Sequence, residues 1–539
     1  MPRIPLVQWV GWIAALALLT VATISVRTAI PLDETRYLAV AWEMWRRGDF
    51  LVPFLNGEPY SHKPPLLFWL IDLGWAVWGP NAWWPRLIAP LLALANIGMT
   101  WRLAARLWPS HSDVRLFAPW VLLSMLIWLV YAQALMFDML VASCALLGLN
   151  AIASGALRTS SLWWGGLGVS IGLGILAKGP AILVHVLPVA LLAPWWAPIE
   201  HRRRWYMQLV LALLLGIALA LIWAIPAGQH GGPVYNQAIF WGQTAHRVVN
   251  SFAHKLPFWW YLAVLPLLMF PWLAWPGLLT QIAKRIRRDQ REIGVRFTLV
   301  WVLAAILIFS AISGKQPHYI LPEAPAFALL LAYGLSQQKD VYRRALAPAL
   351  GLIALGGTLI WKTTIGDIAS APGLTHLPRW SGVGFIFVGL SLLLRLRPMH
   401  QVYWITGTMM GLMVWLLAVV FKPLAPAFDM TPIAQALHRF EKEGHPIAHF
   451  GKYHGQFHFA GRLDRSIDIL SSDDALRHWA TQHPQGVIIL YGKKKSSALF
   501  SQAFRETQVS LFTAADALTL LSSPSPYSQR ISINGDENE

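Results

Sequence analysis

Residues 202–228 read RRRWYMQLVLALLLGIALALIWAIPAG, three arginines followed by a run without a single charged residue. A helix needs about 20 mostly apolar residues to cross the hydrocarbon core of a bilayer. Arginine and lysine gather in the short loops on the cytoplasmic side of a membrane. This stretch is therefore typical of a transmembrane helix that follows a cytoplasmic loop.

The whole chain has the composition of a membrane protein. Of its 539 residues, 56% are hydrophobic and 13% are charged, and the mean hydropathy is +0.48. Soluble globular proteins carry roughly 25% charged residues, so that class is excluded, as are disordered, collagen-like and coiled-coil chains. The single cysteine, Cys144, excludes a disulfide framework or a cysteine-based zinc site within one chain.

The apolar pattern recurs along the chain, and we expect about thirteen transmembrane helices from run length and hydrophobicity. They lie near residues 9–30, 84–107, 115–132, 135–156, 160–176, 180–197, 206–228, 257–278, 294–313, 318–335, 343–361, 378–397 and 401–421. The first run is too long for the apolar core of a signal peptide and no A-x-A site follows it, so we expect it to remain as a helix. The glycine-rich stretch 165–174 predicts close packing of helices.

Basic residues predict the orientation of these helices. Alternate loops carry the arginines and lysines, which places those loops and the N-terminus in the cytoplasm. The six basic loops contain Arg102, Arg106 and Arg115; Arg158; Arg202, Arg203 and Arg204; Lys284, Arg285, Arg287 and Arg288; Lys339, Arg343 and Arg344; and Arg395 and Arg397. Topology thus accounts for the formal charge of +17 better than nucleic-acid binding does. An odd number of spans places the C-terminus outside.

Three segments outside the membrane interrupt the apolar pattern. Residues 31–83 form a periplasmic loop in which 34–47 are amphipathic and predict an interfacial helix. Residues 229–256 are polar. Charge returns after about residue 425, where strand-like and helical runs alternate, so 426–539 predict a small periplasmic α/β domain. We therefore expect an all-α polytopic membrane domain over residues 1–425 and an α/β domain after it.

Two acidic sites lie at the outer boundary of the predicted membrane region. Asp33 and Glu34 follow the first span directly, where they could cap the interfacial helix or take part in chemistry. Asp138 is the only charged residue across two predicted spans. An ionisable residue inside a membrane costs about 2.5 kcal/mol or more unless it faces a partner or a cavity, so function is the default interpretation. Carboxylates at one depth could position an acceptor, act as a base or bind a metal.

Three lysines share this outer level, against the positive-inside rule. They are Lys63 in YSHKPP, Lys178 in LAKGP and Lys315 in SGKQPHY. Each could extend toward lipid headgroups, as lysines at membrane boundaries often do. Three together beside carboxylates instead favour binding of an anion such as a lipid-linked phosphate.

Four histidines are also predicted outside: His62, His246, His254 and His318. Imidazole and carboxylate groups could hold a divalent cation, but no H-E-x-x-H spacing supports a metal site. Headgroup contacts or ordinary surface positions are the simpler interpretation.

Sequence blocks around these residues resemble a known family. The blocks are DETRY (33–37), WEMWRRGD (42–49), VPFLNG (52–57) and YSHKPPLLFW (60–69), followed by Phe137-Asp138, AKGP (177–180) and KQPHYILP (315–322). In this order they resemble the polyprenyl-phosphate-sugar-dependent glycosyltransferases of the GT-C fold. More narrowly, the chain resembles the bacterial lipid A 4-amino-4-deoxy-L-arabinose transferase family, glycosyltransferase family 83, relatives of protein O-mannosyltransferases.

The resemblance implies roles for these residues. Asp33 and Asp138 would be the catalytic carboxylates, and Lys63 would bind the donor phosphate. The other substrate-binding residues would be Glu34, Arg36, Tyr37, Tyr60, Lys178, Lys315 and Tyr319. The family usually has Glu where this chain has His62, so metal binding or the acceptor could differ here. His62 and His254 are the candidate ligands for a divalent metal such as zinc.

The expected function is that of an inner-membrane glycosyltransferase. It would move a sugar, with 4-amino-4-deoxy-L-arabinose implied by the resemblance, from undecaprenyl phosphate to lipid A on the periplasmic side. Core oligosaccharide, O-antigen or protein Ser/Thr remain alternative acceptors. A lipid transporter or flippase fits less well, because transporters place ionisable groups near the midplane of an inverted repeat. We expect a monomer with no nucleic-acid partner.

Overall fold

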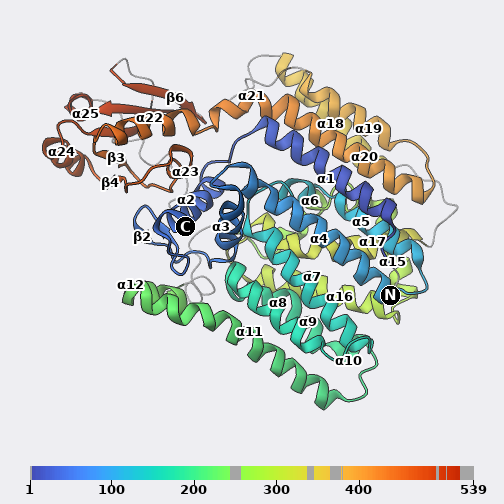
Figure 1. The fold of residues 1–539 in the computed structure, drawn as a ribbon. Helices are drawn as coiled ribbons and strands as arrows, with labels where there is room; N and C mark the ends of the chain where they lie inside the picture. Colours follow the sequence, from blue (N-terminus) through green and yellow to red (C-terminus); the bar gives the residue numbers. More distant parts are fainter. Residues whose placement is uncertain are drawn as a thin grey trace.

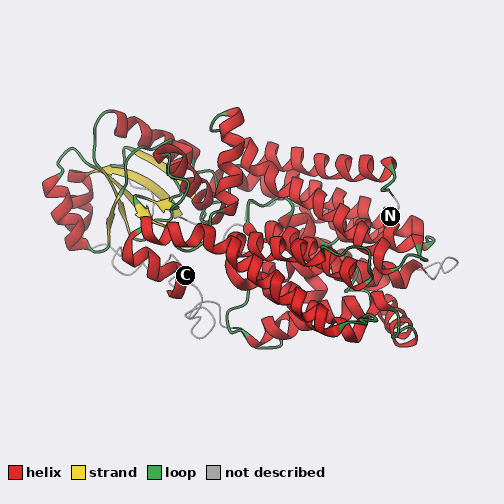
Figure 2. Ribbon diagram, turned by 60° about the horizontal axis from the view of Figure 1, so that its bottom comes forward, coloured by secondary structure: helices red, strands yellow, loops and turns green. Residues whose placement is uncertain are grey.

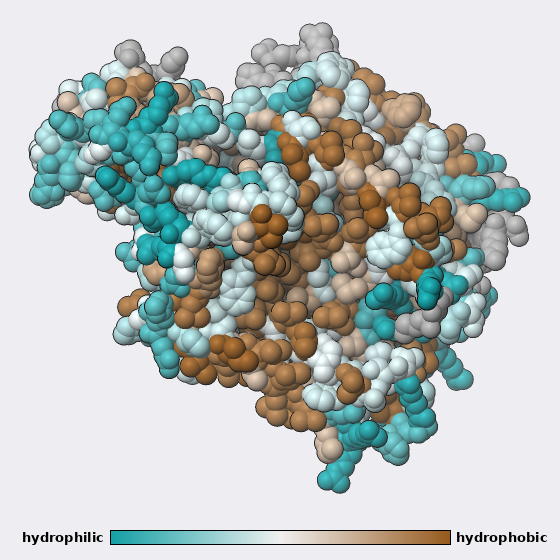
Figure 3. All heavy atoms as spheres, in the orientation of Figure 1, coloured by the Kyte–Doolittle hydropathy of each residue, from teal (hydrophilic) through white to brown (hydrophobic). Residues whose placement is uncertain are grey.

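The computed structural model describes residues 3–242, 256–336, 345–364, 378, 380–492, 497–505 and 507–522. Its helices form one large bundle, and its longer strands gather in a lobe at one end of that bundle (Figures 1 and 2). Brown hydrophobic side chains cover much of the visible face of the bundle, whereas the lobe is mainly teal (Figure 3). Ile222 and Leu307 are 71% and 68% exposed, as expected for helices that face lipid.

Among the described residues, eight helical segments are long and apolar enough to cross a membrane. They are Leu6–Val26, Trp83–Leu107, Phe137–Ala156, Trp163–Leu191, Arg202–His230, Ile293–Ala311, Pro317–Ser336 and Pro398–Lys442. Shorter apolar helices cover Leu66–Trp78, Leu346–Trp361 and Ser381–Leu392. The count of thirteen spans therefore stays a prediction.

Several predicted spans are interrupted in the structure. The run 115–132 is divided between α5 (Ser112–Leu123) and α6 (Leu126–Tyr131). The run 257–278 is divided between α14 (Trp260–Leu268) and α15 (Pro276–Arg288). Proline lacks an N–H and clashes with the preceding turn, so it favours such breaks, and Pro271 and Pro276 lie at the second of them.

Close packing of helices occurs at the predicted glycine-rich stretch. It lies in α8 (Trp163–Lys178), which packs against α11 (Arg202–His230). A Cβ added at Gly168 would lie 2.7 Å from a Leu215 side-chain carbon, and one at Gly172 would lie 2.7 Å from Leu219 Cβ. Small residues thus let the two backbones approach each other, as predicted.

The segment after the first span holds α2 (Asp33–Arg47), the short strands β1 (Phe54–Leu55) and β2 (Glu58–Pro59), and α3 (Leu66–Trp78). The apolar face of α2 is buried as predicted, with Met44 fully covered. Its polar face is only partly open to solvent, because Arg47 is exposed whereas Glu43 is only 2% exposed. The lobe packs against this helix and covers much of it.

The lobe contains a five-stranded sheet with the strand order β4-β3-β5-β7-β6. Its strands are β3 (Ile447–Phe450), β4 (Asp468–Leu470), β5 (Val487–Gly492), β6 (Phe500–Phe504) and β7 (Thr507–Thr513). β3 pairs in parallel with β4 and β5, and β7 pairs antiparallel with β5 and β6. The lobe helices are α22 (Thr431–Lys442), α23 (His458–Gly461), α24 (Asp473–Gln482) and α25 (Ala514–Ser522). Both faces of β5 are covered, since Ile488 and Ile489 are fully buried.

Hydrogen bonds join the lobe to the segment after the first span. Asn56 Nδ2 donates to the Ile467 carbonyl at 2.9 Å, and Ile467 N–H donates to Asn56 Oδ1 at 2.8 Å. Trp42 Nε1 donates to the Leu463 carbonyl at 3.0 Å. The lobe is thereby held against α2, whose first residue is Asp33.

Candidate active site

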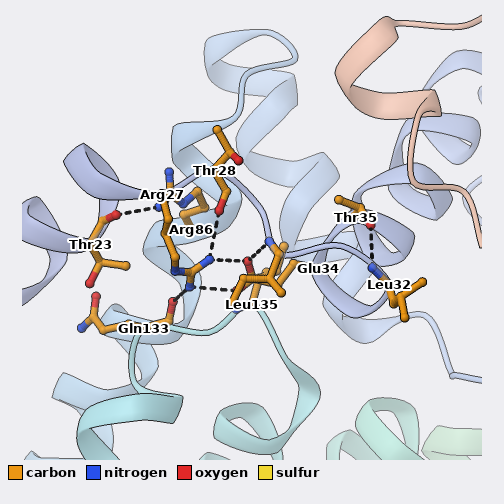
Figure 4. Close-up of polar contacts among 10 residues, drawn as sticks. Thr23, Arg27, Thr28, Leu32, Glu34, Thr35, Arg86, Gln133 and Leu135 are labelled. Carbon is orange, nitrogen blue, oxygen red and sulfur yellow. Dashed lines mark hydrogen bonds and ion pairs between the residues drawn. The ribbon is translucent and has the colours of Figure 1, made fainter. Parts of the chain in front are cut away.

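Asp33 is the first residue of α2 but does not cap it. The residue before the helix is Leu32, whose N–H donates to Thr35 Oγ1 at 3.1 Å (Figure 4). The φ of Leu32 is 84°, a region that side chains rarely occupy and that is enriched at functional sites. Asp33 Oδ1 instead accepts from Arg36 Nη2 at 2.7 Å and from Tyr37 Oη at 3.4 Å. The Asp33 side chain remains 47% exposed.

Asp138 lies in the first turn of α7 (Phe137–Ala156) and is buried. Its Oδ1 accepts from Lys178 Nζ at 2.6 Å, and the two side chains are 5% and 16% exposed. Lys178 is the last residue of α8, and its Nζ lies 4.8 Å from the ring centroid of Tyr319. The structure thus brings together an acid, a lysine and a tyrosine from three separate helical segments.

Tyr37 connects this ion pair to Asp33. Its ring packs edge-on against Phe137, the neighbour of Asp138, at a centroid distance of 4.9 Å. Burial raises the pKa of Tyr37 well above its usual value, and the charges of Asp33 and Asp138 raise it further. The phenol therefore stays protonated and can donate to Asp33. Asp33 and Asp138 thus both lie within electrostatic range of the Tyr37 hydroxyl group.

Lys63 and Tyr60 belong to the same cluster. His318, Lys178 and Lys63 have the largest favourable electrostatic effects on the Asp138 carboxylate. Tyr60 is 6% exposed, and it interacts electrostatically with Tyr37. The site therefore gathers positive groups around one buried carboxylate at the ends of several helices.

Two members of the cluster were not among the predicted site residues. Tyr131 is one of them, since Asp138 and Asp33 both act electrostatically on its hydroxyl group. The second is His318, whose ring centroid lies 5.9 Å from that of Tyr131 and 4.9 Å from that of Tyr319. His318 could have been found from its place in the KQPHY block, whereas Tyr131 precedes Asp138 by seven positions and is brought close only by the turn between α6 and α7.

Glu34 and Lys315, both predicted to bind substrate, contact partners within the chain. The Glu34 carboxylate is 3% exposed and accepts hydrogen bonds from Arg27 and from the backbone of Ile30 and Leu135 (Figure 4). Lys315 is 2% exposed, and its Nζ donates to the backbone carbonyls of Leu256 and Ile312. In this structure both charged groups are buried and paired within the chain, and a substrate contact of either residue stays a prediction.

Comparisons with known proteins found similar sequences and folds. A family described as dolichyl-phosphate-mannose-protein mannosyltransferase matches residues 62–228. An undecaprenyl phosphate-alpha-4-amino-4-deoxy-L-arabinose arabinosyl transferase of Pseudomonas fluorescens is 29% identical over 73% of this chain and 67% of its own length. The corresponding protein of Pseudomonas aeruginosa is 31% identical over 61% of this chain and 59% of its own length.

Solved structures extend the likeness to nearly the whole chain. The crystal structure of ArnT from Cupriavidus metallidurans in the apo state has a TM-score of 0.74, with 19% identity, and the match covers 96% of this chain and 99% of that one. ArnT bound to undecaprenyl phosphate gives a TM-score of 0.71 with the same coverage. The chain therefore has the fold of ArnT, and its sequence is similar to those of undecaprenyl phosphate-alpha-4-amino-4-deoxy-L-arabinose arabinosyl transferases. The predicted resemblance is thereby confirmed, and the chain is a multi-pass membrane protein.

Of the two predicted metal ligands, one lies in the described part of the chain. His62 stacks on the ring of Tyr60 at a centroid distance of 5.3 Å, and His254 lies outside the described residues. In the described part of the chain, no three histidine, cysteine, aspartate or glutamate side chains gather as a metal site would require. The described residues alone therefore do not fit a metal, and we assign no step of the reaction to one.

A polar cavity lies between α2 and the lobe. Its volume is about 530 Å³, and its lining includes Glu43, Arg46, Glu441 and Arg465. None of the cluster residues Asp33, Lys63, Asp138 and Lys178 lines it. The cluster of charged groups at the helix ends is thus separate from this cavity.

Proposed function

We propose that this transferase moves 4-amino-4-deoxy-L-arabinose from undecaprenyl phosphate to a phosphate group of lipid A. Its curated relatives carry the name of that reaction, and the alignments span 59–67% of the length of the first relatives. The observation that carries the proposal is the Lys178–Asp138 ion pair in one cluster with Asp33 and Lys63. Such a cluster supplies both cations for a phosphate and a carboxylate for an acceptor.

The cationic half of the cluster suits the donor. Lys63 and Lys178 would bind the phosphate of the carrier, with Tyr60, Arg36 and Tyr319 lining the same site. Negative charge grows on that phosphate as the bond to the sugar breaks, and fixed cations in a site with little water stabilise it. Asp138 would hold Lys178 in place, because its carboxylate is buried and already accepts from that lysine.

The exposed acid suits the acceptor. Asp33 is the more accessible of the two carboxylates, and Arg36 and Tyr37 hold its Oδ1. In direct displacement, an acceptor oxygen forms a bond to the anomeric carbon while the bond from that carbon to the carrier phosphate breaks with inversion. The electron pair of the broken bond leaves with the phosphate. An acceptor phosphate needs no base, so Asp33 orients it; an acceptor hydroxyl would give its proton to Asp33.

Location and topology are part of the proposal. We place the protein in the bacterial inner membrane with a cytoplasmic N-terminus and with residues 426–539 as a periplasmic domain. The thirteen-span count would put the lobe and the acidic cluster on the same side. Basic loops such as 202–204 and 284–288 favour this orientation. We expect a monomer, and zinc bound by His62 and His254 is kept as a separate proposal that a chelator can test.

In vitro transfer with defined substrates tests the function. The purified chain is given undecaprenyl-phosphate-linked aminoarabinose with lipid A, with core oligosaccharide or with a Ser/Thr peptide, each with and without chelator. We expect transfer to lipid A alone. Transfer only to another acceptor would establish the alternative acceptor class, and movement of the lipid between leaflets without transfer would establish a flippase.

Variants test the assigned residues in the same assay. Lys63→Ala and Asp33→Ala should abolish transfer while leaving the thermal unfolding of the chain unchanged. Matched controls are Lys422→Ala and Asp474→Ala, which change the same residue types at exposed positions outside the cluster. Wild-type rates in both test variants would contradict the assignment of the site.

A further inference from the structure

We propose that Arg27 and Glu34 form a clamp that positions Asp33 relative to the Asp138–Lys178 pair. The proposal rests on the proposed function, because it assigns a positioning role within that same site. Glu34 is the acidic neighbour of Asp33, yet its carboxylate is directed into the protein, where Arg27 and two backbone N–H groups surround it (Figure 4).

Every oxygen of the Glu34 carboxylate accepts two hydrogen bonds. Oε2 accepts from Arg27 Nη1 at 2.6 Å and from Ile30 N–H at 2.8 Å. Oε1 accepts from Arg27 Nη2 at 3.1 Å and from Leu135 N–H at 2.8 Å. Bidentate pairing of this kind fixes geometry as well as charge.

Arg27 connects the same segments from the other side. Its Nη2 also donates to the Gln133 carbonyl at 2.8 Å, and its Nη1 donates to the Thr28 carbonyl at 3.1 Å. The clamp therefore joins the connection between α1 (Leu6–Val26) and α2 to residues 133–135, which precede α7.

These two segments carry the two acids. Asp33 adjoins Glu34, and Asp138 follows Leu135 by three residues, although Glu34 and Leu135 are 101 residues apart in the sequence. A shift of either segment would change the separation between Asp33 and Asp138. Misplacement of reacting groups by about 1 Å can lower a rate about a hundredfold. Loss of the clamp would therefore misalign Asp33 relative to Asp138 and slow the chemical step.

The surroundings make the carboxylate difficult to replace. Arg86 Nη2 donates to the Thr23 carbonyl at 3.1 Å, and the charges of Arg27 and Glu34 both act on the Arg86 guanidinium. Arg27 and the backbone offer only N–H donors to the side chain at position 34. Glutamine there would direct its own NH₂ donor at some of these N–H groups, so hydrogen bonds on that side would be lost. An exchange of the two charges would restore the ion pair but would leave Ile30 N–H and Leu135 N–H without an acceptor.

Steady-state kinetics and donor binding test the clamp in the full-length chain. The variants are Glu34→Gln, Glu34→Asp and the charge exchange Arg27→Glu/Glu34→Arg, with Glu58→Gln as a matched control on the exposed strand β2. The binding probe is undecaprenyl phosphate. We expect Glu34→Gln to lower kcat by at least about tenfold while the Kd for the probe changes by less than about threefold. Glu34→Asp should give an intermediate kcat, and the charge exchange should not restore it.

Three results would overturn the clamp. They are a Glu34→Gln kcat within about twofold of the wild type, a charge exchange that restores the wild-type kcat, and an equal loss of kcat and probe binding in both Glu34→Gln and Glu34→Asp. The last would show a general structural role. Failure of the proposed function is a separate result, because the wild-type chain would then not transfer the sugar at all. Faster amide hydrogen exchange at Leu135 in Glu34→Gln provides a readout that does not depend on activity.

Discussion

Removal of Lys178 should destabilise the protein, because it leaves a buried carboxylate without its partner. Lys178 Nζ lies 2.6 Å from Asp138 Oδ1, and both side chains are far less than one third exposed. Breaking a buried pair by removing one partner costs about 3–5 kcal/mol. Lys63 and His318 also act on Asp138 and offset part of that cost. We therefore expect Lys178→Met to lower the free energy of unfolding by about 2–3 kcal/mol.

A double-mutant cycle separates the pair from its surroundings. Asp138→Asn should also destabilise, whereas the double variant Lys178→Met/Asp138→Asn leaves neither charge buried alone. Contacting residues show interaction energies of about 0.5–3 kcal/mol. We expect about 2 kcal/mol here, so the double variant should lose less stability than the sum of the two single variants.

The measurement is denaturant unfolding in detergent micelles, followed by tryptophan fluorescence, with Lys422→Met as the control. Transfer activity is recorded on the same samples and should fall in all three cluster variants. Single-variant losses that add up to the loss of the double variant within about 0.5 kcal/mol would refute the coupling of Lys178 with Asp138, because independent sites behave in that way.

Three further predictions concern the lobe and the helix packing. Burial lowers the pKa of His449 and of His458 from 6.5 to about 4, so the unfolded state binds more protons than the folded state below pH 6.5. Each histidine should therefore lower the free energy of unfolding of the lobe by about 2 kcal/mol between pH 8 and pH 5. Hydrogen exchange of β5 measured as a function of pH reports this free energy, and a flat profile would refute the prediction. Asn56→Gly keeps the left-handed backbone (φ 55°) but removes both side-chain hydrogen bonds to the lobe. Amide hydrogen exchange at Ile467 should therefore accelerate by an amount equivalent to about 1–3 kcal/mol, and unchanged exchange would mean that these hydrogen bonds do not hold the lobe. Gly74→Ala places a Cβ 1.8 Å from Trp84 Nε1 and should destabilise the protein by about 1–3 kcal/mol or more in thermal unfolding. The control Gly165→Ala, with open space around its Cβ, should be neutral or stabilising. Equal effects of the two substitutions would show that the contact of Gly74 with Trp84 does not limit side-chain size.

Much of the architecture could be predicted from local sequence patterns. Runs such as 206–228 and 84–107 are read directly from hydrophobicity, because a bilayer requires long apolar helices whatever the tertiary contacts. The alternation of strand-like and helical runs after residue 425 likewise matches the lobe, where strands such as β5 and β7 alternate with helices. The number of spans could not be settled in this way, because breaks such as that at residues 124–125 depend on how neighbouring helices accept the freed backbone groups.

The candidate site was predicted in outline. Asp33, Lys63, Asp138 and Lys178 could be proposed because charge at a membrane boundary is costly and therefore conspicuous. The family blocks joined them into one hypothesis. The chemical type of a side chain does not show which direction it takes, and only the structure places Glu34 and Lys315 against partners within the chain.

The sequence by itself determined that the chain is a membrane protein and which charged residues had to be explained, since hydrophobicity and charge are properties of each residue. Only the tertiary structure decided which charges meet. Asp138 pairs with Lys178 from another helix, Glu34 turns inward to Arg27, and Tyr131 joins the cluster across a turn. The physical reason is that a hydrogen bond acts over about 3 Å, a separation that residues far apart in the sequence reach only once the helices have packed.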